Sequence, residues 1–424
     1  MKIFKIPEIY KSGFITSIKK RRQDGDRLKR DFMPSVLDFG KVRINLARHF
    51  GFCYGVENAI EIAYSAIEEN PGKRIFLLSE IIHNSHVNAA LNENGVRFIL
   101  DTTGKQLIPW EEITEEDVII IPAFGTTLEI EAILKKKGIK QIYYKSKCPF
   151  VEKVWTRVSQ IAGKDYTVIV HGKPDHEETR ATFSHSKNVA PSVIIKDMED
   201  ALLLADFIMG RRPAADFTEL FRYRHSEGFD VIRDLLRIGV VNQTTLLAGD
   251  TQEIADFLLQ TIKTKHQLND GNVSAHFANM KDTLCYATND NQSAVITMLS
   301  TKADLAIVVG GYNSSNTSHL VELCEVKLPT YFISSADSMV SGTEIHHWDV
   351  HTHELKNTSS YLPANDPLVI HLTSGASCPD ILIENIILKL LSFYNLSLNA
   401  MEVTCAIDDG YSRATDAAKT NKIL

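Results

Sequence analysis

Four short apolar runs constrain most strongly what this 424-residue chain can fold into. Each is rich in β-branched residues and ends in small or polar residues. The runs are DVIIIPAFGTT (117–127), DYTVIVHGK (165–173), DLAIVVGGYNSSN (304–316) and DPLVIHLTSGAS (366–377). Patterns with helical spacing lie between them, and continuous apolar strands of this kind are typical of parallel sheets covered by helices on both faces. The sequence therefore predicts an α/β fold, in which ligands bind at the carboxyl ends of the strands.

Three of the six cysteines stand in similar surroundings. Cys53 precedes a helical pattern in HFGFCYGVENAI, Cys148 lies between the strand-like KQIYYKSK and the helical PFVEKVWTRVSQI, and Cys285 precedes another helical pattern. The three positions are 95 and 137 residues apart, which are domain-like distances. The recurrence predicts three α/β units, each with a cysteine near a strand-to-helix junction.

A cysteine in such a place has two interpretations. It is either a small buried hydrophobe or a metal ligand or reactive thiolate, because a helix N-terminus favours negative charge. Six cysteines in a chain of this length make a disulfide framework unlikely, and the lack of a CxxC pair disfavours a zinc ribbon or a ferredoxin-type cluster. For Cys324, Cys378 and Cys405 we expect structural roles.

The amino-acid composition limits the cellular locations and the classes of partner that we expect. The net charge is −7, so overall basicity gives no reason to expect a nucleic-acid partner. No apolar run reaches the roughly 18 residues that a membrane span needs. Residues 1–45 form a charged, basic extension without the apolar core of a secretory signal. We therefore expect a cytoplasmic protein with no membrane partner.

The residues after the third apolar run predict a phosphate site. Asn313, Ser314, Ser315 and Asn316 follow Gly311 and precede a helical pattern. Unpaired backbone N–H groups at a helix start, together with hydroxyl and amide donors, can hold a phosphate. The alternative is simple helix capping, for which Ser and Asn are preferred, but a cap needs only one such residue.

Other strand ends carry similar polar sets of hydroxyls, amides, carboxyls and histidines. They include His83 and His86, His171, His176, Glu177 and Glu178, Gln243, Thr244 and Thr245, and Ser374 and Ser377. Taken singly, each set is more often a loop or a cap. Together they suit a small phosphorylated ligand held without many lysines, and the chain lacks both the GxxxxGK[ST] phosphate loop and the GxGxxG dinucleotide fingerprint.

Eight of these motifs, in order, make the sequence resemble the 4-hydroxy-3-methylbut-2-enyl diphosphate reductase family. The resemblance extends from about residue 45 to 390. The motifs are GFCYGVENAI, EIIHNSHVN, KCPFVEKVW, HGKPDHEETRAT, NQTTLLAGDT, CYATNDNQSAV, NSSN and SGASCPDILIENII. The family catalyses the last step of the methylerythritol phosphate route to isoprenoids.

The resemblance implies three similar α/β domains with mainly parallel sheets around a central cavity that holds an iron–sulfur cluster. Together with the residue patterns, it predicts these divisions: an extension at 1–45, domains at 46–147, 148–284 and 285–390, an insertion near 207–232 in the second domain, and a tail at 391–424.

The resemblance also implies the site residues. By position, the ligands of a [4Fe–4S] cluster match Cys53, Cys148 and Cys285, and the proton-delivering glutamate matches Glu178. Thr244 matches a threonine that contacts the substrate. The diphosphate-binding groups match His83, His176, Ser314, Ser315, Asn316 and Ser377.

The implied reaction is the reductive removal of the allylic hydroxyl of (E)-4-hydroxy-3-methylbut-2-enyl diphosphate. It gives isopentenyl and dimethylallyl diphosphate, with the substrate on the iron that has no protein ligand. A small one-electron donor such as ferredoxin or flavodoxin is the expected partner. The alternatives are an iron–sulfur sensor or electron carrier without diphosphate chemistry, and a cluster-free phosphate-binding enzyme with packed cysteines.

One position departs from the family pattern. Many bacterial members have a histidine where this chain has Phe124, which can donate no hydrogen bond. This phenylalanine, the insertion and the long N-terminal extension resemble the plant and cyanobacterial branch of the family.

Overall fold

The structure of the protein, a computed structural model, describes residues 4–28, 30–139, 147–278 and 283–398. The run KQIYYKSK, apart from Lys147, and Cys405 lie outside the described residues. The chain divides into two compact units. The first unit is Met1–Glu57, His83–His86 and Tyr286–Leu424, and the second is Asn58–Ile82 and Val87–Cys285.

The first unit is built on a seven-stranded sheet. Four neighbouring strands at its centre, β2, β14, β10 and β11, run parallel, and the antiparallel strands β1, β12 and β13 extend its two edges. In spatial order the strands are β1 (Ser35–Asp38), β2 (Val42–Leu46), β14 (Leu368–Ser374), β10 (Leu305–Val309), β11 (Thr330–Ile333), β12 (Glu344–Asp349) and β13 (Glu354–Ser359).

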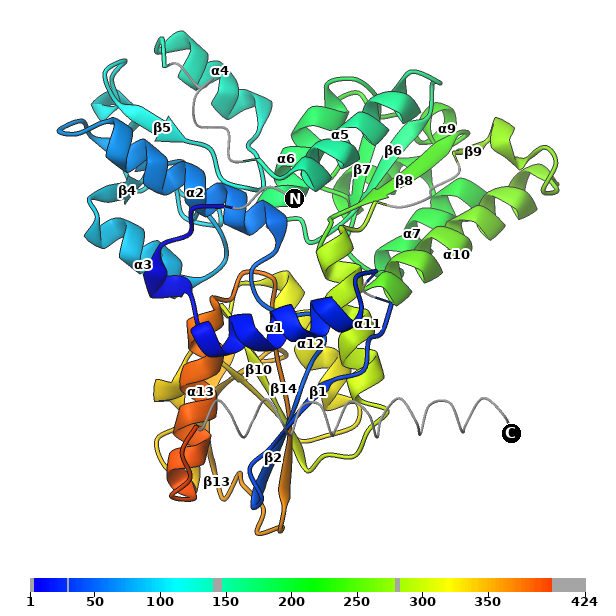
Figure 1. Cartoon of the computed structure of the whole chain (residues 1–424). Coiled ribbons are helices and arrows are strands. Elements are labelled where there is room, and N and C mark those ends of the chain that lie inside the picture. The colour runs from blue at the N-terminus through cyan, green and yellow to red at the C-terminus, as the bar shows by residue number, and fades with distance from the viewer. Residues whose placement is uncertain (1–3, 29, 140–146, 279–282, 399–424) are drawn as a thin grey trace. The chain divides into compact units, whose positions relative to one another are not determined.

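Helices cover both faces of this sheet (Figure 1). Alternate residues along a strand point to opposite faces, so Ile307 packs with α1 (Gly13–Gly25) and α13 (Asp380–Phe393). Its neighbour Val308 packs with α11 (Tyr286–Met298) and α12 (Ser315–Glu325). The unit also contains the 3₁₀ helices η1 (Glu8–Tyr10) and η6 (Ala336–Ser338). The predicted doubly covered parallel sheet is confirmed here.

The structure differs from the predicted boundary at residue 46. Residues 35–46 are not a separate extension, because β2 pairs in parallel with β14, with Ile44 opposite Ile370. Helix α1 also buries Phe14, Ile15 and Ile18 in the same core. The sequence pattern hid this because the pairing joins segments more than 300 residues apart. The other domain boundaries stay predictions.

A buried histidine in β14 predicts how stability depends on pH. His371 is fully buried, and burial lowers its pKa from 6.5 to about 4. Between these values the unfolded chain binds a proton that the folded chain does not. The free energy of unfolding should therefore fall by about 3 kcal/mol as the pH falls from 6.5 to 4.

Urea melts at pH 7 and pH 5 test this expectation. His371→Leu should flatten the fall in unfolding free energy relative to the wild type, whereas the exposed His346→Gln should leave it unchanged. An equally steep fall in His371→Leu would assign the dependence to other groups.

The second unit contains two parallel sheets. The smaller has the order β4 (Val96–Phe98), β3 (Ile75–Leu77) and β5 (Val118–Ile120). The larger has the order β7 (Ser192–Ile195), β6 (Thr167–His171), β8 (Ile238–Asn242) and β9 (Phe277–Ala278). The described residues thus form three sheets, and the division of the chain into three α/β domains stays a prediction.

Helices of the second unit follow the predicted periodicities. In α5 (Pro149–Ala162), the residues Val151, Val154, Val158 and Ile161 form one buried face, as their spacing predicts. The other α-helices are α2 (Tyr54–Glu69) and α3 (Ser85–Glu93), which begin in the first unit, α4 (Leu128–Lys136), α6 (Glu177–Lys187), α7 (Met198–Met209), α8 (Phe217–Leu220), α9 (Val231–Asp234) and α10 (Ala248–His266). The unit also contains the 3₁₀ helices η2 (Trp110–Glu112), η4 (Ala214–Asp216) and η5 (Val273–Ala275). In the described part of the chain, no helix has the length and apolarity needed to cross a membrane.

The predicted insertion near 207–232 covers the edge of the larger sheet. The N–H of Ile194 donates to the carbonyl of Arg224 at 2.7 Å, and that of Ser226 to the carbonyl of Ser192 at 2.9 Å. Phe217 and Phe221 from this segment are buried in the core beside the sheet. The segment therefore protects the open edge of β7, which the polar composition of the stretch did not reveal.

Candidate functional site

The first unit gathers polar side chains at the carboxyl ends of β10 and β14. These strands are parallel neighbours, so the segments that follow them meet at one edge of the sheet. Ser314 caps α12 by accepting a hydrogen bond from the N–H of Thr317 at 3.3 Å. The predicted phosphate-binding residues of this unit are nearly buried: Ser314, Ser315, Asn316 and Ser377 are between 4% and 8% exposed.

Two glycines allow the two strand ends to close around Thr317. A Cβ atom at Gly310 would lie 2.5 Å from Thr317 Oγ1, and one at Gly375 would also collide with this hydroxyl. A third glycine, Gly311, lies against the carbonyl oxygen of His83, where a Cβ would clash. Ser377 Oγ donates to the same carbonyl at 3.0 Å. The segment around His83 is thereby held against both polar loops.

Asn316 has a fixed orientation. Its Oδ1 accepts hydrogen bonds from the N–H of Ala376 at 2.9 Å and from Asn291 Nδ2 at 3.3 Å. Its Nδ2 is buried and has no hydrogen-bond partner among the described residues. A buried donor without a partner is costly, so this amide group is suited to a ligand oxygen.

We predict that Asn316→Asp will raise the KM for a diphosphate substrate by about 10- to 100-fold. The carboxylate keeps the two hydrogen bonds accepted by Oδ1, but it removes the donor and adds a repulsive charge, and a hydrogen bond to a charged group contributes about 1.5–3 kcal/mol. Steady-state kinetics measure the effect, with Asn313→Asp on the exposed side of the same loop as the control. An unchanged KM for Asn316→Asp would place the diphosphate elsewhere.

A backbone hydrogen bond connects Cys53 to the loop that carries Ser377. Its N–H donates to the carbonyl of Ala376 at 3.1 Å, and its own carbonyl accepts the first hydrogen bond of α2, from the N–H of Glu57 at 2.9 Å. Gly51 has a φ of +79°, which favours glycine, and its N–H donates to Ser374 Oγ at 3.1 Å. Cys53 thus starts a helix within a tightly held loop, as its surroundings predicted.

A small cavity opens beside Cys53 within the first unit. Its volume is about 210 Å³. Its lining comes from α1, from the loop before α2 and from the start of α11: Lys19, Gln23, Arg48, His49, Phe50, Gly51, Phe52, Cys53, Tyr286, Ala287, Asp290 and Asn291. Cys53 therefore borders a space whose lining combines cationic, polar and aromatic side chains.

Cys148 occupies the corresponding place in the second unit. Its N–H donates to the carbonyl of Ala123 at 2.9 Å, and its carbonyl accepts from the N–H of Glu152 at 3.2 Å at the start of α5. Burial raises the pKa of the Cys148 thiol above 9.0 and outweighs the lowering by the N–H groups of Phe150 and Val151. Such a thiol is a poor free nucleophile at neutral pH, whereas a bound metal would deprotonate it.

Glu178 is the most buried acidic side chain in the described part of the second unit. It is 1% exposed, in the first turn of α6. Its Oε1 accepts from the N–H of Thr244 at 2.6 Å, and its Oε2 accepts from Thr244 Oγ1 at 3.0 Å. The carbonyl of Thr244 in turn accepts from the N–H of Cys285 at 3.2 Å. Hydrogen bonds therefore connect the Glu178 carboxyl to Thr244, and the backbone of Thr244 to that of Cys285.

His176 caps the same helix. Its Nδ1 accepts from the N–H of Glu178 at 3.2 Å, which fixes the ring and sets its tautomer with the proton on Nε2 when neutral. The ring of Phe124 lies edge-on to it, with centroids 5.9 Å apart. Phe124 therefore supports the His176 ring by contact and donates no hydrogen bond.

A glycine–threonine pair repeats between the units. In the second unit, a Cβ at Gly172, directly after β6, would collide with Thr179 Oγ1, and Thr179 follows seven residues later in α6. In the first unit Gly310 and Thr317 have the same spacing and the same close approach. The repeat agrees with the predicted similarity of the α/β domains, and nothing in composition or periodicity singled it out.

The structure divides the predicted site residues between the two units. The first unit holds Cys53, His83, Ser314, Ser315, Asn316 and Ser377, and the second holds Cys148, His176, Glu178, Thr244 and Cys285. All three candidate cysteine ligands have intermediate exposure, and none forms a disulfide with another described cysteine. Among the described residues, no three Cys, His, Asp or Glu side chains form a group that could hold a metal ion. The roles of these residues stay predictions.

Two other cysteines have the structural roles that we predicted. Cys324 and Cys378 are fully buried, and burial raises the pKa of each thiol to about 12. Both therefore stay protonated and are packed as small apolar groups.

Several residues that support the site were not found from the sequence. Tyr312, directly before the phosphate-type loop, stacks on Trp348 of β12 with centroids 5.0 Å apart. Asn291 orients Asn316, and Gln243 Oε1 accepts from Thr179 Oγ1 at 3.1 Å. Gln243 belongs to a polar set that the sequence already marked, whereas Tyr312 and Asn291 were not found, because their contacts join distant segments.

Polar loops at the carboxyl ends of parallel strands, with cysteines at helix starts, define the chain as an α/β protein whose candidate ligand-binding groups lie at strand ends. It belongs to the LytB protein family, whose model matches residues 44–391.

Curated relatives carry one common name. A 4-hydroxy-3-methylbut-2-enyl diphosphate reductase of Cyanothece sp. is 37% identical over 390 residues, which cover 92% of this chain and 90% of the relative. The reductase of Gloeobacter violaceus is 36% identical, with 90% and 87% covered. These cyanobacterial relatives agree with the predicted branch of the family.

The fold is shared with a solved structure. The E-1-hydroxy-2-methyl-but-2-enyl-4-diphosphate reductase of Plasmodium falciparum aligns with a TM-score of 0.59 at 23% identity, and the match covers 85% of this chain and 92% of that chain. At this identity the likeness concerns the fold.

Proposed function

We infer that the protein is a 4-hydroxy-3-methylbut-2-enyl diphosphate reductase, an oxidoreductase of the methylerythritol phosphate route to isoprenoids. The family membership supports this activity, since the curated relatives carry that name over nine-tenths of the chain. The observation that carries it is the linked set of Glu178, Thr244 and Cys285, which joins an acid to a cysteine through one threonine.

The reaction requires an acid and a source of electrons. The substrate's allylic C–O bond breaks, two electrons and two protons enter, and water leaves with isopentenyl or dimethylallyl diphosphate as the product. Hydroxide is a poor leaving group, so a proton must reach the departing oxygen as the bond breaks.

Glu178 and Thr244 are the groups proposed to deliver that proton. When the carboxyl is protonated, Oε2–H can donate to Thr244 Oγ1, whose hydroxyl then turns its own hydrogen outward. The N–H of Thr244 holds Oε1 at 2.6 Å in either state, so the carboxyl does not rotate during transfer. The pair can thus hold a proton and release it without reorganising.

The diphosphate is proposed to bind to neutral donors. Ser314, Ser315 and Asn316 supply hydroxyl, amide and backbone N–H groups at the start of α12. Ser377 lies in the loop after β14, and His83 and His176 supply imidazoles. The N-terminus of α12 adds a favourable dipole for an anion. These contacts would hold the substrate by its charged end and position its hydroxyl.

The cofactor is proposed to be a [4Fe–4S] cluster on Cys53, Cys148 and Cys285. The three cysteines stand at helix starts, and burial raises the pKa of the Cys148 thiol, which suits a metal-bound thiolate better than an unligated one. Bound there, the cluster supplies one-electron redox chemistry and, at an iron without a protein ligand, Lewis acidity. A ferredoxin or flavodoxin is the proposed source of electrons.

Anaerobic turnover tests the proposed function. Protein purified without oxygen should contain iron and sulfide, and it should oxidise a reduced viologen dye only when the hydroxylated diphosphate is added. The two diphosphate products are then measured by chromatography. Dye oxidation that ignores the substrate would favour a plain electron carrier, and protein that never binds iron would favour a cluster-free enzyme.

A further inference from the structure

The first 50 residues differ in charge from the rest of the chain. They contain thirteen Lys and Arg against five Asp and Glu, a net charge of +8, whereas the whole chain has a net charge of −7. Four basic residues of α1 and the segment after it are exposed: Lys20, Arg21, Arg27 and Arg30. We call these four residues the basic face.

The helix that carries Lys20 and Arg21 of the basic face also lines the cavity beside Cys53. Helix α1 buries Phe14, Ile15 and Ile18 against the sheet, so its opposite side faces solvent. Two further residues of α1, Lys19 and Gln23, line the same cavity as Cys53. Figure 1 shows α1 lying across the helices and strands of the first unit.

An ion pair holds α1 in this place. Lys19 Nζ lies 2.7 Å from Asp380 Oδ1 at the start of α13, and it also lies over the ring of Phe50 at 4.5 Å from the centroid. The side chains of Lys19 and Asp380 are 33% and 19% exposed. These contacts join α1, which carries Lys20 and Arg21, to the loop before Cys53 through Phe50.

We propose that the basic face is the docking surface for a small acidic one-electron carrier protein. This inference rests on the proposed function, which consumes two electrons per substrate. Two reduced carriers would dock in turn, each losing one electron and leaving oxidised, and the two electrons enter the breaking C–O bond together with two protons. The chain has no GxGxxG dinucleotide fingerprint, so an external protein donor is the expected source.

The difference between local and overall charge explains why an acidic carrier would dock on the basic face. A carrier with acidic residues around its redox centre is repelled by a chain whose overall charge is negative, but it is attracted to a local region of opposite sign. The basic face combines that sign with a position beside the cavity that reaches a candidate cluster ligand, Cys53. Electrostatic steering therefore brings the carrier to the side of the first unit where its electron is needed.

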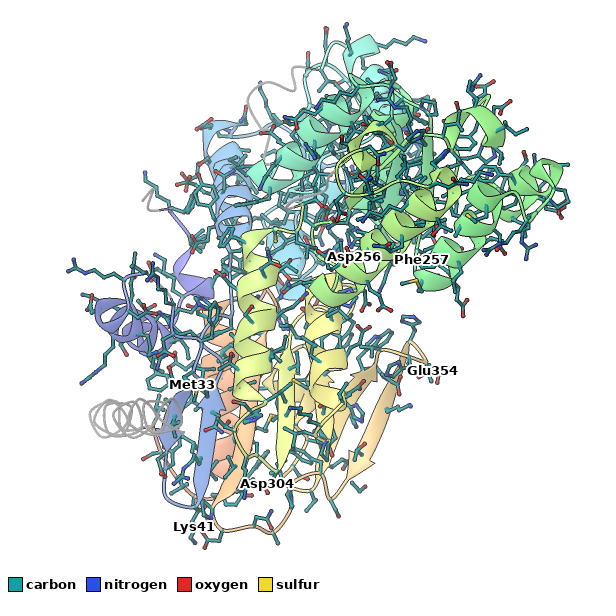
Figure 2. The ribbon with its side chains drawn as sticks, turned by 90° about the vertical axis from the view of Figure 1, so that its right-hand side faces the viewer. Met33, Lys41, Asp256, Phe257, Asp304 and Glu354 are labelled. Carbon is teal, nitrogen blue, oxygen red and sulfur yellow. The ribbon has the colours of Figure 1, made fainter. Side chains whose placement is uncertain are left out.

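The test compares two charge-reversal variants. The docking variant is K20E/R27E/R30E. The matched control, K41E/K302E/K327E, reverses three exposed lysines next to the amino-terminal ends of β2, β10 and β11, at the other end of the same sheet. Figure 2 shows Lys41 and Asp304 at that end, away from Met33, which follows the basic face.

Each protein is assayed with two reductants, an acidic plant-type [2Fe–2S] ferredoxin and a reduced viologen. For the docking variant the KM for ferredoxin should rise about tenfold or more, and its dependence on salt between about 0.05 M and 0.5 M should flatten. Its viologen-driven rate should stay within about twofold of the wild type. The control variant should keep the wild-type values for both reductants.

The outcomes separate the two proposals. If no protein turns over with viologen, the proposed function fails. If viologen turnover is normal and the ferredoxin KM of the docking variant is unchanged, the docking proposal is wrong. Loss of binding to DNA or to phosphatidylglycerol vesicles, with ferredoxin kinetics intact, would assign the basic face to another partner and also overturn it.

Discussion

Cys148→Ser is expected to abolish both the iron–sulfur absorbance and the turnover. Serine has nearly the same size as cysteine and is a good helix cap, so α5 should still form normally in this variant. A serine oxygen is a weaker ligand for iron than a thiolate, because soft thiolates are preferred in clusters. Iron and sulfide analysis, visible absorbance and anaerobic viologen turnover measure the loss.

Cys324→Ser and Cys378→Ser are the matched controls. Both thiols are fully buried and packed in the apolar cores of the first unit. These replacements should lower the free energy of unfolding by about 1–3 kcal/mol, because a hydroxyl is buried in an apolar place, yet they should keep the cluster. A Cys148→Ser protein with full iron content and normal rates would rule out this residue as a ligand.

The sequence predicted the elements better than their assembly. The buried face of α5 follows from its helical spacing, and the parallel strands at the centres of the sheets follow from apolar runs with polar ends. The pairing of β2 with β14 could not be predicted, because parallel pairing between distant segments leaves no local pattern. The burial of Phe217 and Phe221 could not be predicted either, because they lie in a polar stretch and pack against other segments of the chain.

For the candidate site, residue types were predictable and orientations were not. Helix starts rich in Ser and Asn marked the loop at Ser314, because hydroxyls and amides cap helices and bind anions equally well. The sequence does not say which atom of Asn316 is committed to Ala376 and which is left for a ligand. That distinction depends on contacts across 60 residues, and it turns a good helix cap into a candidate binding group.

Glu178→Gln is expected to lower kcat by about 10²- to 10⁴-fold while the cluster and the KM change little. Glutamine has the same shape, so Oε1 can still accept from the N–H of Thr244, and the new Nε2 can donate to Thr244 Oγ1. What disappears is the titratable proton between the carboxyl and the hydroxyl. Because the loss concerns the transition state alone, it should appear in kcat and in kcat/KM equally.

The neighbouring Glu177→Gln provides the control for Glu178→Gln. Glu177 lies in the same first turn of α6 and is 9% exposed, so its replacement removes an equal charge from the same helix end. If the charge at the helix start were what matters, through the dipole or the fold, the two variants would lose activity alike. A large loss confined to Glu178→Gln, with unchanged visible absorbance, assigns proton delivery to this carboxyl. Equal, modest losses in both would leave the acid to be sought in the substrate's own diphosphate.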